Sequence, residues 1–133
     1  MSVTTASTVP FTPVITRGLA AAAVAAAATA TVATAGRTAG VSLTVSDKPI
    51  PASGFALLTA AFSVVGLVLA LVLARTAGHP RTAFVRTTIA LTALSLVPDL
   101  LADASAATKI VLMSTHLVAA SIVIPTIARR LSA

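Results

Sequence analysis

The sequence predicts an all-α fold, an integral membrane bundle of four transmembrane helices with a short extended outer loop between helices 1 and 2. Three observations lead to this prediction. The mean hydropathy is +1.04 and only 9% of the 133 residues are charged, which lies outside the range of soluble domains. The charged residues form short clusters, separated by uncharged runs of roughly 18 residues or more, long enough to cross a bilayer. The basic residues are dispersed at the ends of these runs, as in membrane proteins.

The charge balance and the lack of cysteine exclude several classes of function. Nine Lys and Arg residues against three acidic residues give a net charge of +6. A nucleic-acid-binding protein gathers its basic side chains on one face or stripe, so their dispersal here argues against nucleic acid as a partner. Without cysteine there is no disulfide, no thiol nucleophile and no thiolate metal site. The expected partner is the lipid bilayer.

The N-terminal part of the chain predicts a tail and a weakly apolar first span. Residues 1–16 are rich in Ser, Thr, Val and Pro, and we expect a mobile tail because Pro10 and Pro13 oppose a regular helix. The first span, residues 17–36, is dominated by alanine, whose small side chain favours close packing against other helices. A cleaved signal peptide is the alternative, since residues 33–35 resemble a cleavage site, but the apolar stretch exceeds the usual ~7 to 15 residues.

The remaining elements follow from the alternation of polar loops and apolar runs. VSLTVS alternates apolar and hydroxyl residues and predicts a short extended segment, and DKPIPASG supplies the turn signals after it. The second span has no charge over about 21 residues. The basic loop RTAGHPRTAFVR precedes the third span, and ADASAATK leads to the fourth. These spans are residues 54–74, 84–101 and 110–128, and the whole four-helix domain is residues 17–131.

Basic residues predict the orientation in the membrane. Four spans place both ends of the chain on one side, where six basic residues flank the spans, against three on the opposite side. The larger set is Arg17, Arg75, Arg81, Arg86, Arg129 and Arg130, and the smaller set is Arg37, Lys48 and Lys109. Because the side richer in Lys and Arg stays in the cytoplasm, we predict a multi-pass protein of a bacterial plasma membrane with cytoplasmic N- and C-termini.

The second span carries small and hydroxyl residues on one face. Thr59, Ser63 and Gly66 recur at steps of four and three residues. Such a seam lets membrane helices approach closely and form hydrogen bonds. We expect these three positions to serve helix packing, either within the bundle or between copies in a homo-oligomer.

A polar stripe runs along the third span. Thr88, Thr92, Ser95 and Asp99 recur at steps of four, three and four residues and therefore share one helix face. An ionised carboxylate in the apolar slab costs a few kcal/mol unless it reaches the interface or finds a partner. We therefore expect this face to turn away from lipid.

His116 is the expected partner of Asp99. Asp99 lies about seven residues before the centre of the last turn and His116 about ten after it, so at ~1.5 Å per residue both lie roughly 10 to 15 Å from the turn on antiparallel helices. We predict an outward-facing polar node of Asp99, His116, Ser95 and Thr92, together with Asp103. One alternative is a structural clasp between Asp99 and His116 that binds nothing. Another is that Asp99 reaches the headgroup region while His116 bonds a hydroxyl such as that of Ser95.

No residue set predicts catalysis, a metal site or a cofactor. A Ser/His/Asp set can be assembled around His116, but serine is so common here that the coincidence carries little weight. Asp99 and Asp103, at i and i+4, are the only pair at ligand spacing, which is too few ligands for a metal. We therefore expect no catalytic residue, no metal and no cofactor.

Two stretches of the sequence are distinctive, FVRTTIALTALSLVPDLLAD (residues 84–103) and THLVAASIVIPTIARRL (residues 115–131). Together they resemble a family of small actinobacterial membrane proteins of unknown function. The resemblance extends from about residue 15 to residue 131 and includes GVSLTV in the first loop. It implies an integral membrane protein of four helices, and it implies no activity, substrate or catalytic residue.

The expected function is that of a small membrane binding or accessory module with an outward-facing polar node. Its ligand, a small molecule or a lipid, is not named by the sequence. An oligomeric transporter or channel element is the alternative, and it requires several copies because one chain of 133 residues is small for alternating access. An intramembrane enzyme is a third reading, and it requires a nucleophile or a metal at the node.

Overall fold

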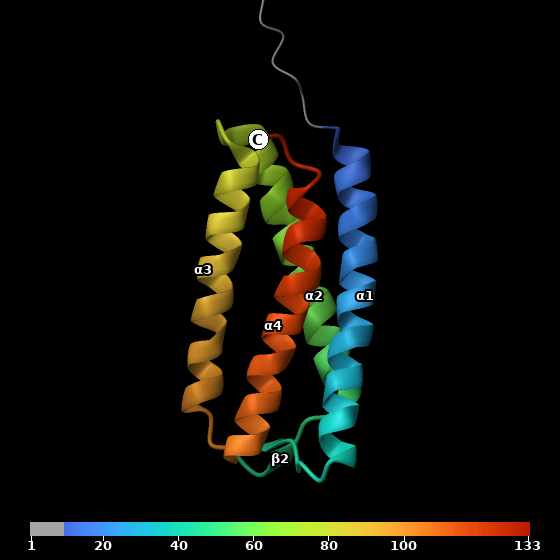
Figure 1. Ribbon diagram of the computed structural model, residues 1–133, viewed down its shortest axis with the longest axis vertical. Coiled ribbons are helices and arrows are strands. Elements are labelled where there is room, and N and C mark those ends of the chain that lie inside the picture. The colour runs from blue at the N-terminus through green and yellow to red at the C-terminus, as the bar shows by residue number, and fades with distance from the viewer. Residues whose placement is uncertain (1–9) are drawn as a thin grey trace, which may run out of the picture.

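The computed structural model of the chain describes residues 10–133, which form four antiparallel helices and a small β-hairpin (Figure 1). The helices are α1 (Phe11–Thr38), α2 (Ala52–Thr76), α3 (Pro80–Leu101) and α4 (Ala106–Ala128), and the strands are β1 (Thr44–Val45) and β2 (Lys48–Pro49). All four helices are long and apolar enough to cross a membrane. The predicted all-α fold is therefore confirmed, and the chain has the character of a multi-pass membrane protein.

α1 begins at Phe11, earlier than the proline content predicts. Residues 11–16 are helical rather than part of a tail, whereas the predicted tail residues 1–9 lie outside the described part of the chain. Pro13 is tolerated because it lies in the first turn, where the backbone N–H groups have no partner within the helix. The Arg75 guanidinium at the end of α2 lies 4.3 Å from the centre of the Phe11 ring, a cation–π contact that joins the two helix ends.

The alanine-rich face of α1 packs closely against α2 and α4, as expected for small side chains. Ala21, Ala25 and Ala33 are buried on this face. At Gly18 the approach is very close, since a Cβ there would lie 2.5 Å from Leu67 Cδ1 on α2. In a membrane, where lipid tails are as apolar as leucine, such close contact supplies much of the packing attraction between helices.

The hairpin closes one end of the bundle, which we call the hairpin end. Its two strands pair antiparallel, and Ser46 and Asp47 between them have φ of 47° and 61°, as a two-residue type I′ turn requires. The Ser46 amide donates to the Asp103 carbonyl oxygen at 2.9 Å, which ties the hairpin to the α3–α4 loop. Leu43 is fully buried beside Phe55 and Leu112. The predicted extended segment is thus present as two very short strands.

The outer surface of the bundle is apolar, and α3 is its least enclosed helix. Leu57, Phe62 and Leu101 are 71%, 71% and 79% exposed, as expected for side chains that face lipid. α3 packs mainly on α4 and less on α2, whereas α1 packs on both α2 and α4. Figure 1 shows α3 standing to one side of the other three helices. A pocket on this side of the bundle is lined by α2, α3 and α4.

Candidate functional site

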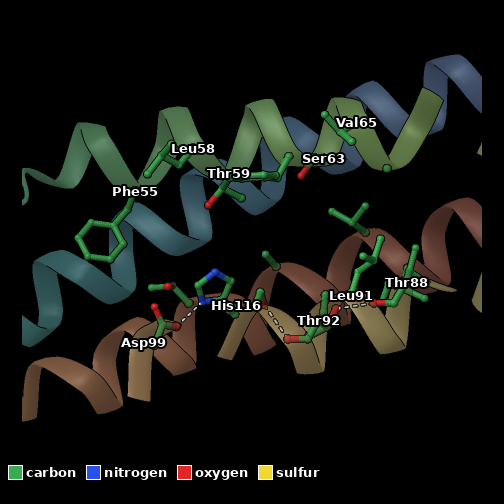
Figure 2. Close-up of a pocket in the computed structure, with 18 of the residues that line it drawn as sticks. Phe55, Leu58, Thr59, Ser63, Val65, Thr88, Leu91, Thr92, Asp99 and His116 are labelled. Carbon is green, nitrogen blue, oxygen red and sulfur yellow. Dashed lines mark hydrogen bonds and ion pairs between the residues drawn. The ribbon is translucent and has the colours of Figure 1, made fainter. Parts of the chain in front are cut away.

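A pocket of about 610 Å³ lies between α2, α3 and α4. Its volume is in the range of small-molecule sites in proteins, roughly 300–1,000 Å³. Most of the lining is apolar, with Phe55, Phe62 and Leu69 from α2 and Val123 and Ile124 from α4. Figure 2 shows the pocket between the α2 ribbon on one side and α3 and α4 on the other. A mostly apolar cavity with a few converging polar groups is the usual form of a ligand site.

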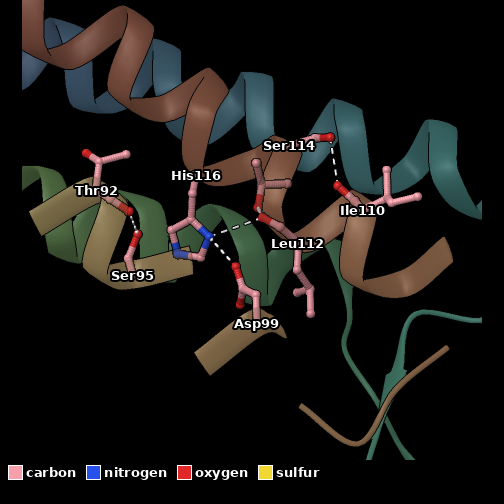
Figure 3. Close-up of polar contacts among 8 residues, drawn as sticks. Thr92, Ser95, Asp99, Ile110, Leu112, Ser114 and His116 are labelled. Carbon is pink, nitrogen blue, oxygen red and sulfur yellow. Dashed lines mark hydrogen bonds and ion pairs between the residues drawn. The ribbon is translucent and has the colours of Figure 1, made fainter. Parts of the chain in front are cut away.

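The predicted polar stripe of α3 faces this pocket. Thr88, Thr92, Ser95 and Asp99 all belong to its lining. The Thr92 hydroxyl donates to the Thr88 carbonyl oxygen at 2.8 Å (Figure 2). The Ser95 hydroxyl donates to the Thr92 carbonyl oxygen at 2.6 Å (Figure 3). Thr88 donates to the Phe84 carbonyl oxygen at 2.7 Å. Because each hydroxyl hydrogen is used within the helix, these side chains present acceptor lone pairs to the pocket.

The structure brings Asp99 and His116 together in the pocket wall. His116 Nδ1 lies 2.8 Å from Asp99 Oδ2, and the same nitrogen lies 3.1 Å from the Leu112 carbonyl oxygen (Figure 3). The Asp99 side chain is 12% exposed and the His116 side chain 39%. Figure 2 shows the imidazole ring between Asp99 on α3 and Thr59 on α2.

The two contacts of His116 Nδ1 are not equivalent. The contact with the Leu112 carbonyl has hydrogen-bond geometry, whereas Asp99 Oδ2 is buried and receives no aligned hydrogen bond from residues 10–133 despite its ion-pair distance from the ring. We assign a proton to Nδ1 from these partners, because a carbonyl oxygen accepts only. The Nδ1 hydrogen then points at Leu112, and the buried oxygen of Asp99 keeps its capacity to accept.

The node lies below the surface of the hairpin end. Asp99 precedes the end of α3 at Leu101 by two residues, about 3 Å along the helix, whereas His116 lies ten residues, about 15 Å, from the start of α4. α4 therefore extends beyond α3 at this end, as Figure 1 shows. The carboxylate is close to the end of its own helix but recessed beneath the hairpin and the first turns of α4.

The other sequence-predicted site residues separate into two groups. Thr59, Ser63 and Gly66 line the pocket from α2. Thr59 Oγ1 also lies 2.9 Å from Thr29 Oγ1 on α1, and Ser63 is buried. Gly66 makes no close approach to another helix, since no described atom outside its chain neighbours and its own helix backbone lies within 4 Å of the position a Cβ would take. Asp103 is exposed in the loop after α3 and does not line the pocket. It lies past the helix end, so the i, i+4 spacing no longer places it beside Asp99.

Sequence reasoning missed two buried threonines near the site. Thr115 precedes His116, is 6% exposed and donates to the Leu112 carbonyl oxygen at 2.6 Å. Thr29 is fully buried in α1 and links that helix to Thr59. The sequence position of Thr115 could have identified it, because it adjoins a histidine within an apolar span. Thr29 could not have been identified, because it is one of many Ala and Thr residues in α1 with no distinguishing pattern. Within residues 10–133 there is no group of three or more His, Cys, Asp or Glu side chains placed to hold a metal ion.

Comparison with known proteins gives a family and no function. The model of the family of unknown function DUF6069 matches residues 9–133, and so covers all four helices, the hairpin and the pocket. No curated protein matches the chain, and no solved structure matches it. The chain belongs to the family of unknown function DUF6069.

Proposed function

We propose that this protein is a membrane-embedded binding module for a small, mostly apolar molecule that carries one polar group. The observation that carries the proposal is the contact between Asp99 and His116 in the wall of a 610 Å³ pocket. Ionisable side chains within membrane spans are costly, and they commonly mark ligand or ion sites. A clasp that only joined α3 to α4 has no need of a cavity beside it.

A binding role fits the pocket better than a channel does. A conducting path needs polar groups or water along its whole length. The Asp99–His116 pair lies toward the hairpin end, whereas Leu69, Phe84 and Val123 line the other end of the pocket. The apolar end favours a site with one opening over a path through the bundle.

We further propose that the protein resides in a bacterial plasma membrane with its termini in the cytoplasm and the hairpin outside. The support is the distribution of basic residues, six on the terminal side against three on the hairpin side, since cytoplasmic flanks are enriched in Lys and Arg. In this orientation the Asp99–His116 node belongs to the outer half of the membrane. The ligand would then come from the outer leaflet or from outside the cell.

Native mass spectrometry of the protein purified in lipid nanodiscs tests the binding role. We expect wild-type protein to carry a bound small molecule and Gly66→Leu to carry none. Gly66 lies in the pocket lining with open space around its Cβ position, so the larger side chain occupies the pocket without a clash. Asp103→Asn is the matched control and should retain the ligand, because Asp103 lies outside the pocket.

Two results together contradict the binding role. The first is that the wild-type protein carries no bound molecule. The second is that no fraction of a lipid and metabolite extract from the expressing cells raises its unfolding temperature. The same extract applied to Gly66→Leu measures nonspecific stabilisation by amphiphiles, which must be subtracted from the wild-type response.

A further inference from the structure

We propose that the ligand is a lipophilic amine, whose ammonium group donates to Asp99 while its apolar tail lies along the pocket, and that it enters from the bilayer between α2 and α3. This inference rests on the binding role proposed above and names the chemical class of the ligand. Three features of the pocket support it independently: its charge, the polarity of its free hydrogen-bonding groups, and the position of its opening.

The charge of the pocket favours a cation. Asp99 and His116 are the only ionisable residues in its lining, which contains no Lys or Arg among the described residues. A carboxylate or phosphate head would meet the Asp99 carboxylate in an apolar environment with no guanidinium or ammonium to offset it. Like charges at short range in such surroundings repel strongly, so the site discriminates against anionic amphiphiles.

The free hydrogen-bonding groups on the α3 and α4 side of the pocket are acceptors. The Thr88, Thr92 and Ser95 hydroxyls donate to carbonyls of their own helix. Asp99 Oδ2 is buried and receives no aligned hydrogen bond within the described residues. In the neutral imidazole with its proton on Nδ1, the other ring nitrogen of His116 is also an acceptor. A complementary head group must therefore supply N–H or O–H donors, and an ammonium group supplies both donors and positive charge.

The shape of the pocket fits a chain-like molecule that arrives from lipid. The lining extends along α2 from Phe55 to Leu69, fourteen residues or about 21 Å. Leu58, Phe62 and Val65 line the pocket and are also 57%, 71% and 61% exposed, so this edge of the pocket is open on the lipid-facing side. A ligand with an apolar tail can pass through this opening without leaving the bilayer.

A matched series of dodecyl amphiphiles tests the class of ligand. Dodecylammonium, dodecanol, dodecyltrimethylammonium and dodecanoate share one tail and differ in charge and in N–H or O–H donors. Each is titrated into nanodiscs that contain wild-type protein, Asp99→Asn, Asp103→Asn or Gly66→Leu, and binding is read by native mass spectrometry. Partition into lipid is common to all four proteins, so differences between them report the site.

We expect dodecylammonium to bind wild type and Asp103→Asn equally and to bind Asp99→Asn roughly 10- to 100-fold more weakly, the usual range for a lost hydrogen bond to a charged group. Gly66→Leu should also lose dodecylammonium, and it tests the site even if Asp99→Asn does not fold. The series should rank dodecylammonium first, because dodecyltrimethylammonium lacks a donor, dodecanol lacks charge and dodecanoate is repelled.

Other outcomes overturn the inference at distinguishable points. If dodecanol or dodecanoate binds as tightly as dodecylammonium, and Gly66→Leu abolishes that binding, the amine class is wrong while the binding role stands. If dodecyltrimethylammonium binds as tightly as dodecylammonium, the head group does not need an N–H donor, and that part of the inference is wrong. If no amphiphile binds and cysteines at Phe62 and Leu94 cross-link two copies, the opening belongs to a dimer interface and the inference fails. Absence of any bound molecule, native or added, overturns the binding role as well.

Discussion

Replacing Gly18 by alanine tests whether α1 packs against α2 as an integral part of the bundle. The added Cβ would lie 2.5 Å from Leu67 Cδ1, 3.1 Å from Cδ2 and 3.2 Å from Cγ. Leu67 is only 5% exposed and belongs to the core cluster, so its side chain has little room to move away. Overpacking of this kind costs about 1–3 kcal/mol of unfolding free energy.

Gly66→Ala is the matched control for this substitution. Both glycines lie inside helices, so both substitutions gain the same helix propensity, up to about 1 kcal/mol. Apart from its chain neighbours and the backbone of its own helix, no atom of the described residues lies within 4 Å of the Cβ position at Gly66. The difference between the two variants therefore isolates the contact with Leu67, and Gly18→Ala should be less stable than Gly66→Ala by about 1–3 kcal/mol.

The unfolding free energy is measurable in mixed micelles titrated with a denaturing detergent and followed by far-ultraviolet circular dichroism, since the chain has neither Trp nor Tyr for fluorescence. Leu67→Val in the Gly18→Ala background should recover part of the loss, because the smaller side chain makes room for the added methyl group. Equal stability of the two alanine variants would refute the packing of α1 described above, and so would a further loss of stability on adding Leu67→Val.

Two further predictions concern the link between α1 and α2 and the orientation in the membrane. Thr29→Val and Thr59→Val, singly and together, should show a coupling of roughly 0.6–1.7 kcal/mol in the same unfolding assay, because their hydroxyls lie 2.9 Å apart in a partly buried position. Strictly additive losses would mean that the hydrogen bond does not form. Single cysteines at Ser46 in the hairpin and Ala77 between α2 and α3 can be labelled in intact cells, because the chain has no cysteine of its own. An impermeant thiol reagent should modify Ser46→Cys and leave Ala77→Cys unmodified until the cells are permeabilised, and the reverse pattern would invert the proposed orientation.

The number and type of helices could be predicted because membrane spans have a strong signal in composition and length. The ends of the helices could not, since a helix continues beyond its apolar part wherever the backbone allows it. α1 thus begins at Phe11, with Pro13 in its first turn, and α4 begins at Ala106 with Ser105 as its N-cap. The hairpin turn was also hard to foresee, because Ser46 and Asp47 adopt positive φ without a glycine to indicate it.

The meeting of Asp99 and His116 followed from counting residues on either side of one turn, which works because antiparallel neighbours joined by a short loop have little freedom in register. The same counting failed for Asp103, because α3 ends at Leu101 and the helical spacing ends with it. Predicting the contact of Thr59 with Thr29 requires the register between α1 and α2. The sequence of α1 does not specify that register, because its Ala and Thr residues are nearly equivalent from one turn to the next. The pocket depends on the distance between α3 and α2. That distance results from the packing of all four helices, so no local sequence pattern predicts it.

The central claim is that Asp99 and His116 are in contact within the membrane-spanning part of the protein, and solid-state nuclear magnetic resonance in lipid bilayers measures that contact directly. The chain has only three aspartates and two histidines, so labelling aspartate Cγ with carbon-13 and histidine side chains with nitrogen-15 gives a spectrum with few pairs. We predict one Asp–His dipolar contact that disappears in Asp99→Asn and persists in Asp103→Asn. A wild-type spectrum with no such contact, or a contact that survives Asp99→Asn, would contradict the account.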